Sequence, residues 1–406
     1  MLNVVILNGG RGASAIIPAL LAQQRLHVTS VVNAYDDGKS TGAIRRFFGM
    51  LGPSDIRKVQ ELMLPKDDPD YENYLALFQY RFPLDCVRED IFDHLKLFAN
   101  GESNELVGIN LTNIRVREKL KSFLDEFLAG LNTIEKVRQE EFDFTDCSIM
   151  NCLYAGAFLA SNRNIEQATV CIDRLFQLCG TVLPTSIEDK KLVAQRENGE
   201  MLYSEADIVE LRSNVRVERI YLLNNNLEKS DFDFLKNDEK RSYLERHHCY
   251  VSVSSGVRLA LQQADIIIYS AGTQHSSLYP TYMSTGLAES ISDNRSALKI
   301  FITNIGADYE TPSYKASDYI RGAHRYLNLS DERTYSMEEL FDAIFINKSC
   351  FKANETYVEY DEEGFHDISI NRLIDIFESE DKPGKHDGTK VVQTILDLFE
   401  DKYFQG

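Results

Sequence analysis

Two adjacent carboxylates, a lysine and two hydroxyls lie close together near the amino terminus, in VVNAYDDGKSTGAIRRFFG (residues 31–49). These side chains belong to Asp36, Asp37, Lys39, Ser40 and Thr41. The Gly-Lys-Ser run at 38–40 is typical of a nucleoside-triphosphate P-loop, but that pattern requires a glycine at position 33, where the chain has Asn33. The carboxylates also sit where a P-loop uses backbone N–H groups to hold phosphate. The loop therefore departs from a P-loop, and its chemistry has to be derived from its own side chains.

The paired carboxylates of this loop suit a metal ion and a hydroxyl group. Asp36 and Asp37 offer hard oxygen ligands for Mg²⁺, and a carboxylate can also accept the proton of a hydroxyl. Hydrogen bonds to phosphate oxygens can come from Lys39, Ser40, Thr41 and Arg45. A diphosphate with its metal ion would suit both kinds of charge in the loop, because the carboxylates bind the metal and the cations bind the phosphate oxygens. The alternative is a solvated turn capped by aspartate, since Asp and Gly are common in turns.

A glycine-rich turn follows the first predicted strand, in NGGRGAS (residues 8–14). Its candidate phosphate-binding residues are Gly9, Gly10, Gly12, Ala13 and Ser14. Glycines let the backbone approach a phosphate, and the start of the following helix favours negative charge. A tight turn without a ligand is one alternative. A dinucleotide site is another, because Asp36 lies 24 residues after Gly12, where a ribose-binding acid would fall.

A third candidate loop, YSAGTQHSSLY (residues 269–279), follows the most apolar predicted strand. Hydroxyls and backbone N–H groups at the next helix start could bind phosphate there, from Gly272, Thr273, Ser276 and Ser277. His275 is a candidate acid or base, although a single loop histidine is more often a surface residue. Elsewhere, GPSDIRK (residues 52–58) places Asp55 and Arg57 after a turn, which as a bare pattern is an ordinary helix start.

The order of predicted elements indicates a doubly wound, mostly parallel, Rossmann-like α/β fold. A strand over residues 3–8, a glycine turn, a helix over 15–23 and a strand over 27–35 open the chain. Further buried strands are expected over 265–273 and 297–308. Ligands of such sheets lie at the carboxyl ends of strands. We therefore expect one site formed by three loops, at residues 9–14, 36–45 and 271–278.

The rest of the chain divides into helical and mixed segments. Helical spacing from about 58 to 145 predicts a helical insertion, and a later helix over 164–180 would have Gly180 as its C-cap. Asn198-Gly199 predicts a hairpin turn in a strand region over 191–209. We assign residues 1–327 to one α/β domain and residues 328–406 to an acidic, mainly helical C-terminal extension.

The composition limits the classes of function. The chain has 406 residues, 43% of them hydrophobic, and its net charge of −19 argues against nucleic acid or an anionic membrane as the main partner. No apolar run approaches the roughly 20 residues that span a bilayer, and the start MLNVVILNGG lacks the features of a secretory signal. The seven cysteines include no C-x-x-C pair, so we expect reduced thiols, no zinc site and a cytoplasmic protein.

Taken together and in order, these segments resemble the family of 2-phospho-L-lactate transferases and the related gluconeogenesis-factor proteins. The family's GGGTG-like loop, ADDGGSSGRLR and PGDIRN correspond here to LNGGRGAS, AYDDGKSTGAIR and PSDIRK. Its later SVGNLL, RGRVLPVT and GPGSLYTS correspond to SIMNCL, CGTVLPTS and AGTQHSSLYPT. A CNVMTQPGET…ASDHV segment is similar to TNIGADYETPSYKASDYI. The resemblance covers residues 3–327 and implies the same α/β fold.

The resemblance implies two kinds of activity. One branch of the family transfers a phospholactyl group from a guanosine diphospho-lactate donor to the hydroxyl of a deazaflavin, with Mg²⁺. The other branch binds a UDP-sugar and acts in cell-wall and carbon regulation with no established chemistry. The loops AYDDGKSTG and PSDIRK are closer to the UDP-sugar branch. The expected partner is a small molecule linked to a nucleoside diphosphate of GDP or UDP type, and the family also implies a homodimer.

Carried over by position, the resemblance also implies a role for each loop. Asp36 and Asp37 would hold the metal or activate the acceptor hydroxyl. The diphosphate and nucleotide would contact the turn 9–14, Ser40, Thr41, Asn151 and Gly272–Ser277. The third loop is longer than the family's pattern. Three single residues also depart from it, namely Lys39 for glycine, Arg11 for threonine and Met150 for glycine.

Overall fold

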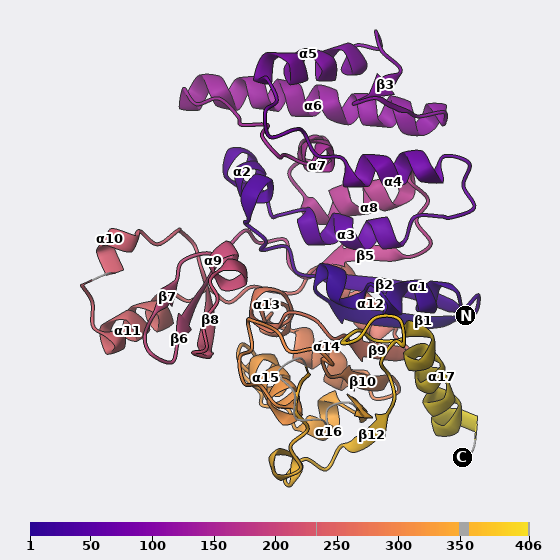
Figure 1. Cartoon of the computed structure of the whole chain (residues 1–406), viewed down its shortest axis with the longest axis vertical. Coiled ribbons are helices and arrows are strands. Elements are labelled where there is room, and N and C mark those ends of the chain that lie inside the picture. Colours follow the sequence, from indigo (N-terminus) through magenta and orange to yellow (C-terminus); the bar gives the residue numbers. More distant parts are fainter. Residues whose placement is uncertain (233, 349–356, 405–406) are drawn as a thin grey trace.

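A seven-stranded sheet forms the core of the computed structural model, which describes residues 1–232, 234–348 and 357–404 (Figure 1). The strand order is β12-β11-β10-β9-β1-β2-β5, and every neighbouring pair is parallel. Helices flank the sheet. The predicted doubly wound, mostly parallel α/β fold is therefore confirmed.

The strands of the central sheet are short apolar segments, as expected of parallel strands that are covered on both faces. Their bounds are β1 (Leu2–Asn8), β2 (Leu26–Val32), β5 (Thr181–Pro184), β9 (Ile266–Tyr269), β10 (Leu298–Ile302), β11 (Ala343–Asn347) and β12 (Asn371–Asp375). In β9, three isoleucines and a tyrosine are all buried. The helices of this part are α1 (Ile16–Leu21), α12 (Ser255–Gln262), α13 (Tyr279–Tyr282), α14 (Leu287–Asp293) and α15 (Ala316–Leu327).

The strand order reverses at β1. From β1 the sheet continues to β2 and β5 on one side, and to β9, β10, β11 and β12 on the other. In open α/β sheets a crevice forms outside the carboxyl ends of the strands at such a reversal. The loops that follow β1 and β9 are thus placed where this kind of sheet binds its ligands.

Helices α2 to α8 form a lobe at the top of Figure 1. They are α2 (Lys39–Phe48), α3 (Ser54–Leu62), α4 (Tyr71–Gln79), α5 (Arg88–Ala99), α6 (Ile114–Arg138), α7 (Ile149–Ala160) and α8 (Ile165–Leu175). A short hairpin of β3 (Glu105–Leu106) and β4 (Ile109–Asn110) interrupts them. The predicted helical insertion lies within this helical lobe.

A smaller, antiparallel sheet forms a second lobe on the left of Figure 1. It contains β6 (Lys191–Arg196), β7 (Met201–Leu202) and β8 (Val217–Leu223), with α9 (Glu205–Glu210), α10 (Lys229–Phe232) and α11 (Asn237–His247). The hairpin turn predicted at Asn198-Gly199 is confirmed, because β6 and β7 pair antiparallel and Gly199 has a φ of +84°. We call this unit the small-sheet lobe.

Two sequence-based boundaries are wrong. The strand region expected over 191–209 ends in helix α9, because the Ser204 side chain accepts the N–H of Asp207 and caps a helix there. The C-cap expected at Gly180 is replaced by Phe176, since α8 ends at Leu175. Gly180 instead allows a close approach to the sheet, because a Cβ at this position would lie 2.8 Å from the carbonyl oxygen of Val28 on β2.

The C-terminal extension is joined to the α/β domain more closely than the predicted division after residue 327 suggests. It contributes helices α16 (Met337–Leu340) and α17 (Gly388–Phe404), but also β11 and β12 of the central sheet. The acidic composition hid these strands, although β11 is an AIFIN run that is buried throughout. α17 packs on α1, at the right of Figure 1. Residues 349–356 and 405–406 of the extension lie outside the described part.

Two further expectations concern the cysteines, which were expected to be reduced, and the lack of a segment long and apolar enough to span a bilayer. Cys86, Cys147, Cys152, Cys171, Cys179 and Cys249 are free thiols, and Cys350 lies outside the described residues. Across the described ranges, every helix is too short or too polar to cross a membrane.

The packing of α6 on α7 generates a stability prediction. A Cβ on Gly156 would lie 1.8 Å from the backbone oxygen of Phe123, so Gly156→Ala should lower the free energy of unfolding by at least about 2 kcal/mol in urea titrations. Gly130→Ala is the matched control on the same helix pair. The Cβ of this alanine would lie 2.5 Å from the flexible end of the Leu159 side chain, which can move aside. Alanine also has a higher helix propensity than glycine, so we expect a near-neutral effect on the free energy of unfolding. Equal losses in the two variants would contradict this account.

Candidate functional site

A cleft of about 570 Å³ opens at the carboxyl edge of the central sheet. The three predicted loops meet in it, together with the start of α3, helix α9, the loop after β10 and the turn before α17. The predicted site residues that line it are Gly9, Gly12, Asp36, Lys39, Ser40, Thr41, Asp55, Arg57, Gly272, Thr273, Ser276 and Ser277. The sheet topology therefore brings together segments that are far apart in the sequence.

The first and third loops touch through bare backbone. A Cβ on Gly9 would lie 2.3 Å from the Cβ of Ser277, and one on Gly12 would lie 2.5 Å from the carbonyl oxygen of Ala271. Only glycine permits these approaches, since backbone and a short side chain on the other side cannot move aside. The two loops at the strand-order reversal thus form one continuous surface of backbone.

Side chains from neighbouring strands fix the third loop. Asn304, after β10, accepts the N–H of Gly272 at 2.9 Å and donates to its carbonyl oxygen at 3.0 Å. From the end of β2, the Asn33 side chain donates to the carbonyl oxygen of Ser276 at 2.9 Å. Glu310 accepts the backbone N–H groups of His275 and Ser276, each at 3.0 Å. A π-helical turn over Gln274–Leu278 results, and it is held from both sides.

The second loop presents the start of α2 to the cleft. Gly38 is the N-cap, and the first-turn hydroxyls of Ser40 and Thr41 lie near the Nδ2 of Asn151, at 3.2 and 3.5 Å. Asn151 is itself buried on α7 and supports these hydroxyls from behind, instead of lining the pocket as expected. Lys39 adopts a φ of +43°, a left-handed conformation that costs a non-glycine residue free energy. It stands where the resemblance places a glycine, and its side chain is 71% exposed.

The two adjacent aspartates point to different places. Asp36 lines the cleft and accepts the N–H of Gly38 at 2.9 Å. Asp37 faces α9 of the small-sheet lobe, where its carboxylate accepts the N–H of Ala206 at 3.0 Å. Its own N–H donates to the Glu205 carboxyl at 3.4 Å. Burial raises the pKa of Asp37, and the hydrogen bond from Ala206 opposes this shift. Asp37 therefore links the second loop to the small-sheet lobe.

Glu205 is a cleft residue that the sequence did not reveal. It begins α9 and is only 7% exposed, and burial together with the charges of Asp36, Asp55 and Asp37 raises its pKa to about 10. The carboxyl is therefore protonated at neutral pH and can donate a hydrogen bond. No local pattern marks it, because its role arises from the approach of α9 to the second loop.

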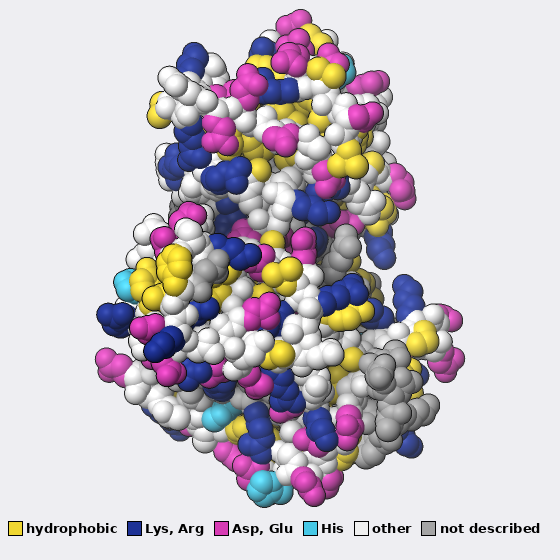
Figure 2. All heavy atoms as spheres, turned by 60° about the vertical axis from the view of Figure 1, so that its left-hand side comes forward, with side chains coloured by type: hydrophobic (Ala, Val, Ile, Leu, Met, Phe, Trp, Pro, Cys, Tyr) yellow, Lys and Arg dark blue, Asp and Glu magenta, His cyan; other side chains and the backbone are white. Residues whose placement is uncertain are grey.

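Cations lie along the helical side of the cleft. Lys58 pairs with Asp55 at 2.8 Å, and the charges of Asp55 and Asp36 outweigh burial to raise the pKa of Lys58. Arg57 donates to the carbonyl oxygen of Phe78 at 2.9 Å, and Arg81 pairs with an aspartate of the helical lobe at 2.6 Å. Figure 2 shows the molecule narrowing below the helical lobe, with Lys and Arg side chains gathered along the lobe's lower part.

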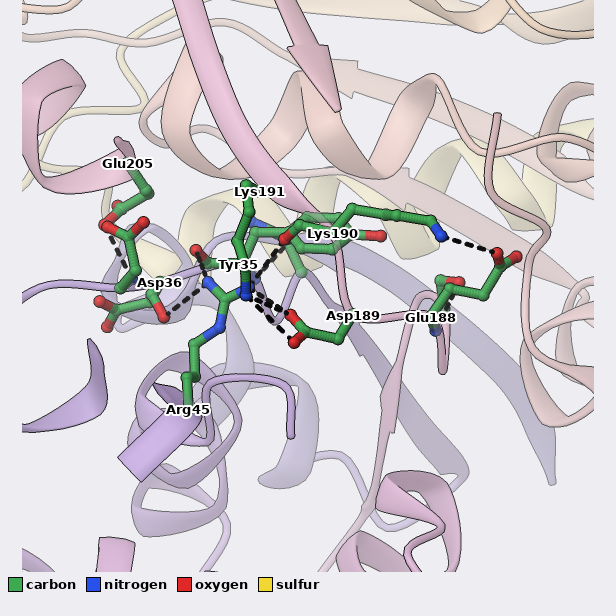
Figure 3. A network of polar contacts seen from close by, with 11 residues as sticks. Tyr35, Asp36, Arg45, Glu188, Asp189, Lys190, Lys191 and Glu205 are labelled. Carbon is green, nitrogen blue, oxygen red and sulfur yellow. Dashed lines mark hydrogen bonds and ion pairs between the residues drawn. The ribbon is translucent and has the colours of Figure 1, made fainter. Parts of the chain in front are cut away.

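Arg45, which we expected to bind phosphate, lies beneath the second loop (Figure 3). Its guanidinium donates to the backbone oxygens of Tyr35 at 2.6 Å and Lys190 at 2.7 Å. It also pairs with the carboxylate of Asp189 at 2.6 Å. These bonds use the guanidinium for holding the loop against the segment that leads into β6, so its role is structural.

The other expected phosphate-binding residues of the first loop lie outside the lining. Gly10 has a φ of +57°, and a Cβ there would lie 2.7 Å from the carboxylate of Asp55, so this glycine makes room for α3. Ala13 is buried, and Ser14 is exposed outside the cleft. His275 is also buried rather than at the surface, between Tyr279 and Tyr314, and burial lowers its pKa to about 3. Such a histidine is a poor candidate for an acid or base at neutral pH.

The carboxylates of the cleft provide a test of the expected Mg²⁺. Within the described residues, no group of three or more His, Cys, Asp or Glu side chains is placed to hold a metal alone. Asp36 and Asp55 nevertheless open on the same cleft, and burial followed by the charge of Asp36 raises the pKa of Asp55. Mg²⁺ is usually held by one or two carboxylates together with phosphate oxygens and water. The residues therefore fit Mg²⁺ that arrives with a phosphorylated ligand, with Asp55 in the place expected for Asp37.

The protonated Glu205 predicts how stability depends on pH. Its pKa is about 10 in the fold against an ordinary value of 4.5, so the folded protein retains a proton that the unfolded chain releases, and stability falls as pH rises between these values. Between pH 7 and 9 the wild-type chain should lose about 2–3 kcal/mol more than Glu205→Gln, measured by urea unfolding. Glu210→Gln, an exposed change on the same helix, should behave as wild type. Parallel losses in wild type and Glu205→Gln would show that this carboxyl is ionised.

The chain is similar to known proteins over nearly its whole length. The family described as 2-phospho-L-lactate transferase CofD matches residues 4–382. A gluconeogenesis factor from Listeria monocytogenes is 23% identical over 397 residues, which are 97% of this chain and 94% of the relative. A gluconeogenesis factor from Halalkalibacterium halodurans is 24% identical over 401 residues, 97% of this chain and 96% of that one.

A solved structure shares the fold. It is a member of the UPF0052 family from Bacillus halodurans, superposes with a TM-score of 0.65 at 19% identity, and covers 98% of this chain and 100% of its own. The resemblance to this family is confirmed by the family match over residues 4–382. The chain belongs to the 2-phospho-L-lactate transferase CofD family.

Proposed function

We propose that the cleft binds a small molecule linked to a nucleoside diphosphate, of guanosine or uridine type, in a cytoplasmic protein. The observation that carries this proposal is the convergence of a glycine turn, the start of α2 and the π-helical turn on one cleft with cations along one side. Backbone N–H groups at a helix start and charged donors together are a general way of binding phosphate.

Each part of the cleft has a place in this proposal. The diphosphate lies against the backbone of Gly9 and Gly12, which line the cleft without side chains. Hydroxyls at Ser40 and Thr41 donate to its oxygens, and Lys39 supplies a positive charge at the rim. Asp36 and Asp55 would hold Mg²⁺ jointly with the phosphates, and the ion would neutralise charge on the phosphate oxygens.

The first candidate use of this binding is transfer of a phosphate-linked group to a hydroxyl acceptor. The acceptor oxygen attacks the phosphorus that carries the group, the P–O bond to the departing nucleoside monophosphate breaks, and Asp36 accepts the hydroxyl proton. The neutral Glu205 carboxyl can donate a hydrogen bond to an oxygen of the bound diphosphate, since its proton is retained at neutral pH. Enzymes accelerate such reactions mainly by positioning the reacting groups and by stabilising the charge on the phosphate oxygens.

The second candidate is a regulator that binds a UDP-sugar without turnover. The link from Asp37 to α9 favours it, because occupancy of the second loop would be passed directly to the small-sheet lobe through the bonds with Ala206 and Glu205. The relatives described above as gluconeogenesis factors also favour it. Transfer and regulation use the same binding site and differ in whether product forms.

The chemistry can be tested with paired variants. Wild-type protein, Mg²⁺ and nucleoside-diphosphate-linked donors with hydroxyl acceptors should yield nucleoside monophosphate, detected by chromatography. Asp36→Asn should reduce this rate at least about 100-fold, because it removes the proton acceptor and a metal ligand. Asp37→Asn should cost less, because an amide oxygen still accepts from Ala206. Tight binding of a UDP-sugar with no product after long incubation would reject transfer and leave the regulator.

Lys39 offers a second test in which stability and affinity move in opposite directions. Lys39→Gly should raise the free energy of unfolding by about 1 kcal/mol, because glycine tolerates the φ of +43°. Lys39→Ala keeps the strained conformation and should not stabilise the fold. Both variants should weaken binding of a nucleoside diphosphate by about fivefold, measured by titration calorimetry at low salt. Unchanged affinity in both would remove Lys39 from the phosphate site.

A further inference from the structure

The end of the cleft beside β10 is built from two segments, of which the sequence motifs include only the first. One is the loop Asn304–Asp308 after β10, and the other is the turn Gly384–His386 before α17. A Cβ on Gly384 would lie 3.7 Å from the Cα of Gly306, so the two segments lie side by side. The family match ends at residue 382, just before this turn. The C-terminal extension therefore supplies a wall of the cleft.

The turn holds Lys385 on a fixed backbone. The Lys385 N–H donates to the carbonyl oxygen of Lys382 at 3.0 Å, and the Lys385 carbonyl accepts the N–H of Ser379 at 2.8 Å. The N–H of Gly384 donates to the carboxylate of Glu378 at 2.6 Å. Gly384 has a φ of +78°, which a glycine adopts without strain. Lys385 is thus presented to the cleft by an ordered turn.

A donor and an acceptor are left available at this end. The Lys385 ammonium has no hydrogen-bond or ion-pair partner within residues 1–232, 234–348 and 357–404, whereas Lys58, Arg57 and Arg81 are engaged with protein groups. One carboxylate oxygen of Asp308 accepts the N–H of Glu310 at 2.8 Å. The other oxygen has no hydrogen-bond partner within the same ranges, and Asp308 does not pair with Lys385 there.

This end of the cleft includes residues with little or no side chain. Gly306, Ala307 and Gly384 line it together with Ile305 and His386, so part of the wall is bare backbone against which a flat ring can lie. The phosphate-binding loops follow β9, β1 and β2, which are the first, second and third strands from β10. Neighbouring strands lie about 4.8 Å apart, so these loops are displaced by roughly 5–14 Å along the sheet edge. A nucleotide with its diphosphate on those loops would extend its base toward β10.

Building on the proposed nucleotide binding, we propose that Lys385 and Asp308 read the nucleobase and select keto bases over amino bases. An ammonium group only donates hydrogen bonds and a carboxylate only accepts them. Guanine and uracil present a carbonyl acceptor next to a ring N–H donor. Adenine and cytosine present an amino donor at the corresponding position, next to a ring acceptor. Lys385 donates to the base carbonyl, and Asp308 accepts the ring N–H. With adenine or cytosine, the Lys385 donor would face the amino donor of the base, and the Asp308 acceptor would face a ring acceptor.

Titration calorimetry with GDP, UDP, ADP and CDP in the presence of Mg²⁺ tests this selection. The wild-type chain should bind GDP and UDP at least about tenfold more tightly than ADP and CDP. Lys385→Met should remove most of this ratio, and Lys385→Arg, which restores a donor, should keep it. Lys382→Met is the matched control, because Lys382 belongs to the same turn and its side chain is outside the cleft lining. Asp308→Asn keeps the bond to Glu310 and should also reduce the ratio.

The outcomes separate this inference from the function on which it rests. Equal affinity of the wild-type chain for all four nucleotides would overturn base selection while leaving nucleotide binding in place. A ratio that survives in both Lys385→Met and Asp308→Asn would assign selection to other residues and overturn the proposal. Binding of none of the four nucleotides would reject the proposed function, and base selection with it. Far-ultraviolet circular dichroism of each variant confirms that it is folded.

Discussion

The site depends on one constraint, which is that the turn after β1 and the loop after β9 must approach each other without side chains between them. Gly9 against Ser277 and Gly12 against Ala271 satisfy it at the point where the strand order reverses. Neighbouring strands then secure the arrangement, with Asn33 holding the third loop from β2 and Asn304 holding it from β10. The result is a strip of backbone along the cleft that is fixed by packing before any ligand arrives, so little conformational entropy is lost on binding.

Charge imposes the second condition on the cleft. A site for an anionic ligand that also contains carboxylates has to limit repulsion, and the fold does so in two ways. Lys58 compensates Asp55 through a short ion pair, and Glu205 keeps its proton. A cation that entered among the carboxylates would lower the pKa of Glu205, because opposite charge favours the ionised form. Metal and proton are therefore coupled through the same group of side chains.

The sequence predicts the parts of this structure that depend on local residue patterns. Apolar runs, glycine turns and the ordered motifs were enough for the parallel sheet, the helical lobe and the meeting of three loops. Arg45 and Asn151 were misplaced because a basic or amide side chain next to a motif has the same spacing whether it faces the ligand or supports the loop from behind. Glu205 and Lys385 were missed because their positions arise from tertiary contacts across long sequence separations. The division after residue 327 leaves β11 and β12 outside the α/β domain because these two strands sit within an acidic segment.

Glu205 and Lys385 both reach the cleft from segments outside the motifs, and this bears on how the site acquires specificity. The loops after β1, β2 and β9 are held by backbone approaches and buried amides, so their geometry leaves little room for change. The small-sheet lobe lines the cleft through α9, with Glu205 among its lining residues, and the turn before α17 lines it through Gly384–His386. Substitution in these two segments can alter the proton, the charge and the base-facing wall without disturbing the phosphate-binding backbone. A chain that keeps the ordered motifs can therefore change its ligand through residues that the motifs do not contain.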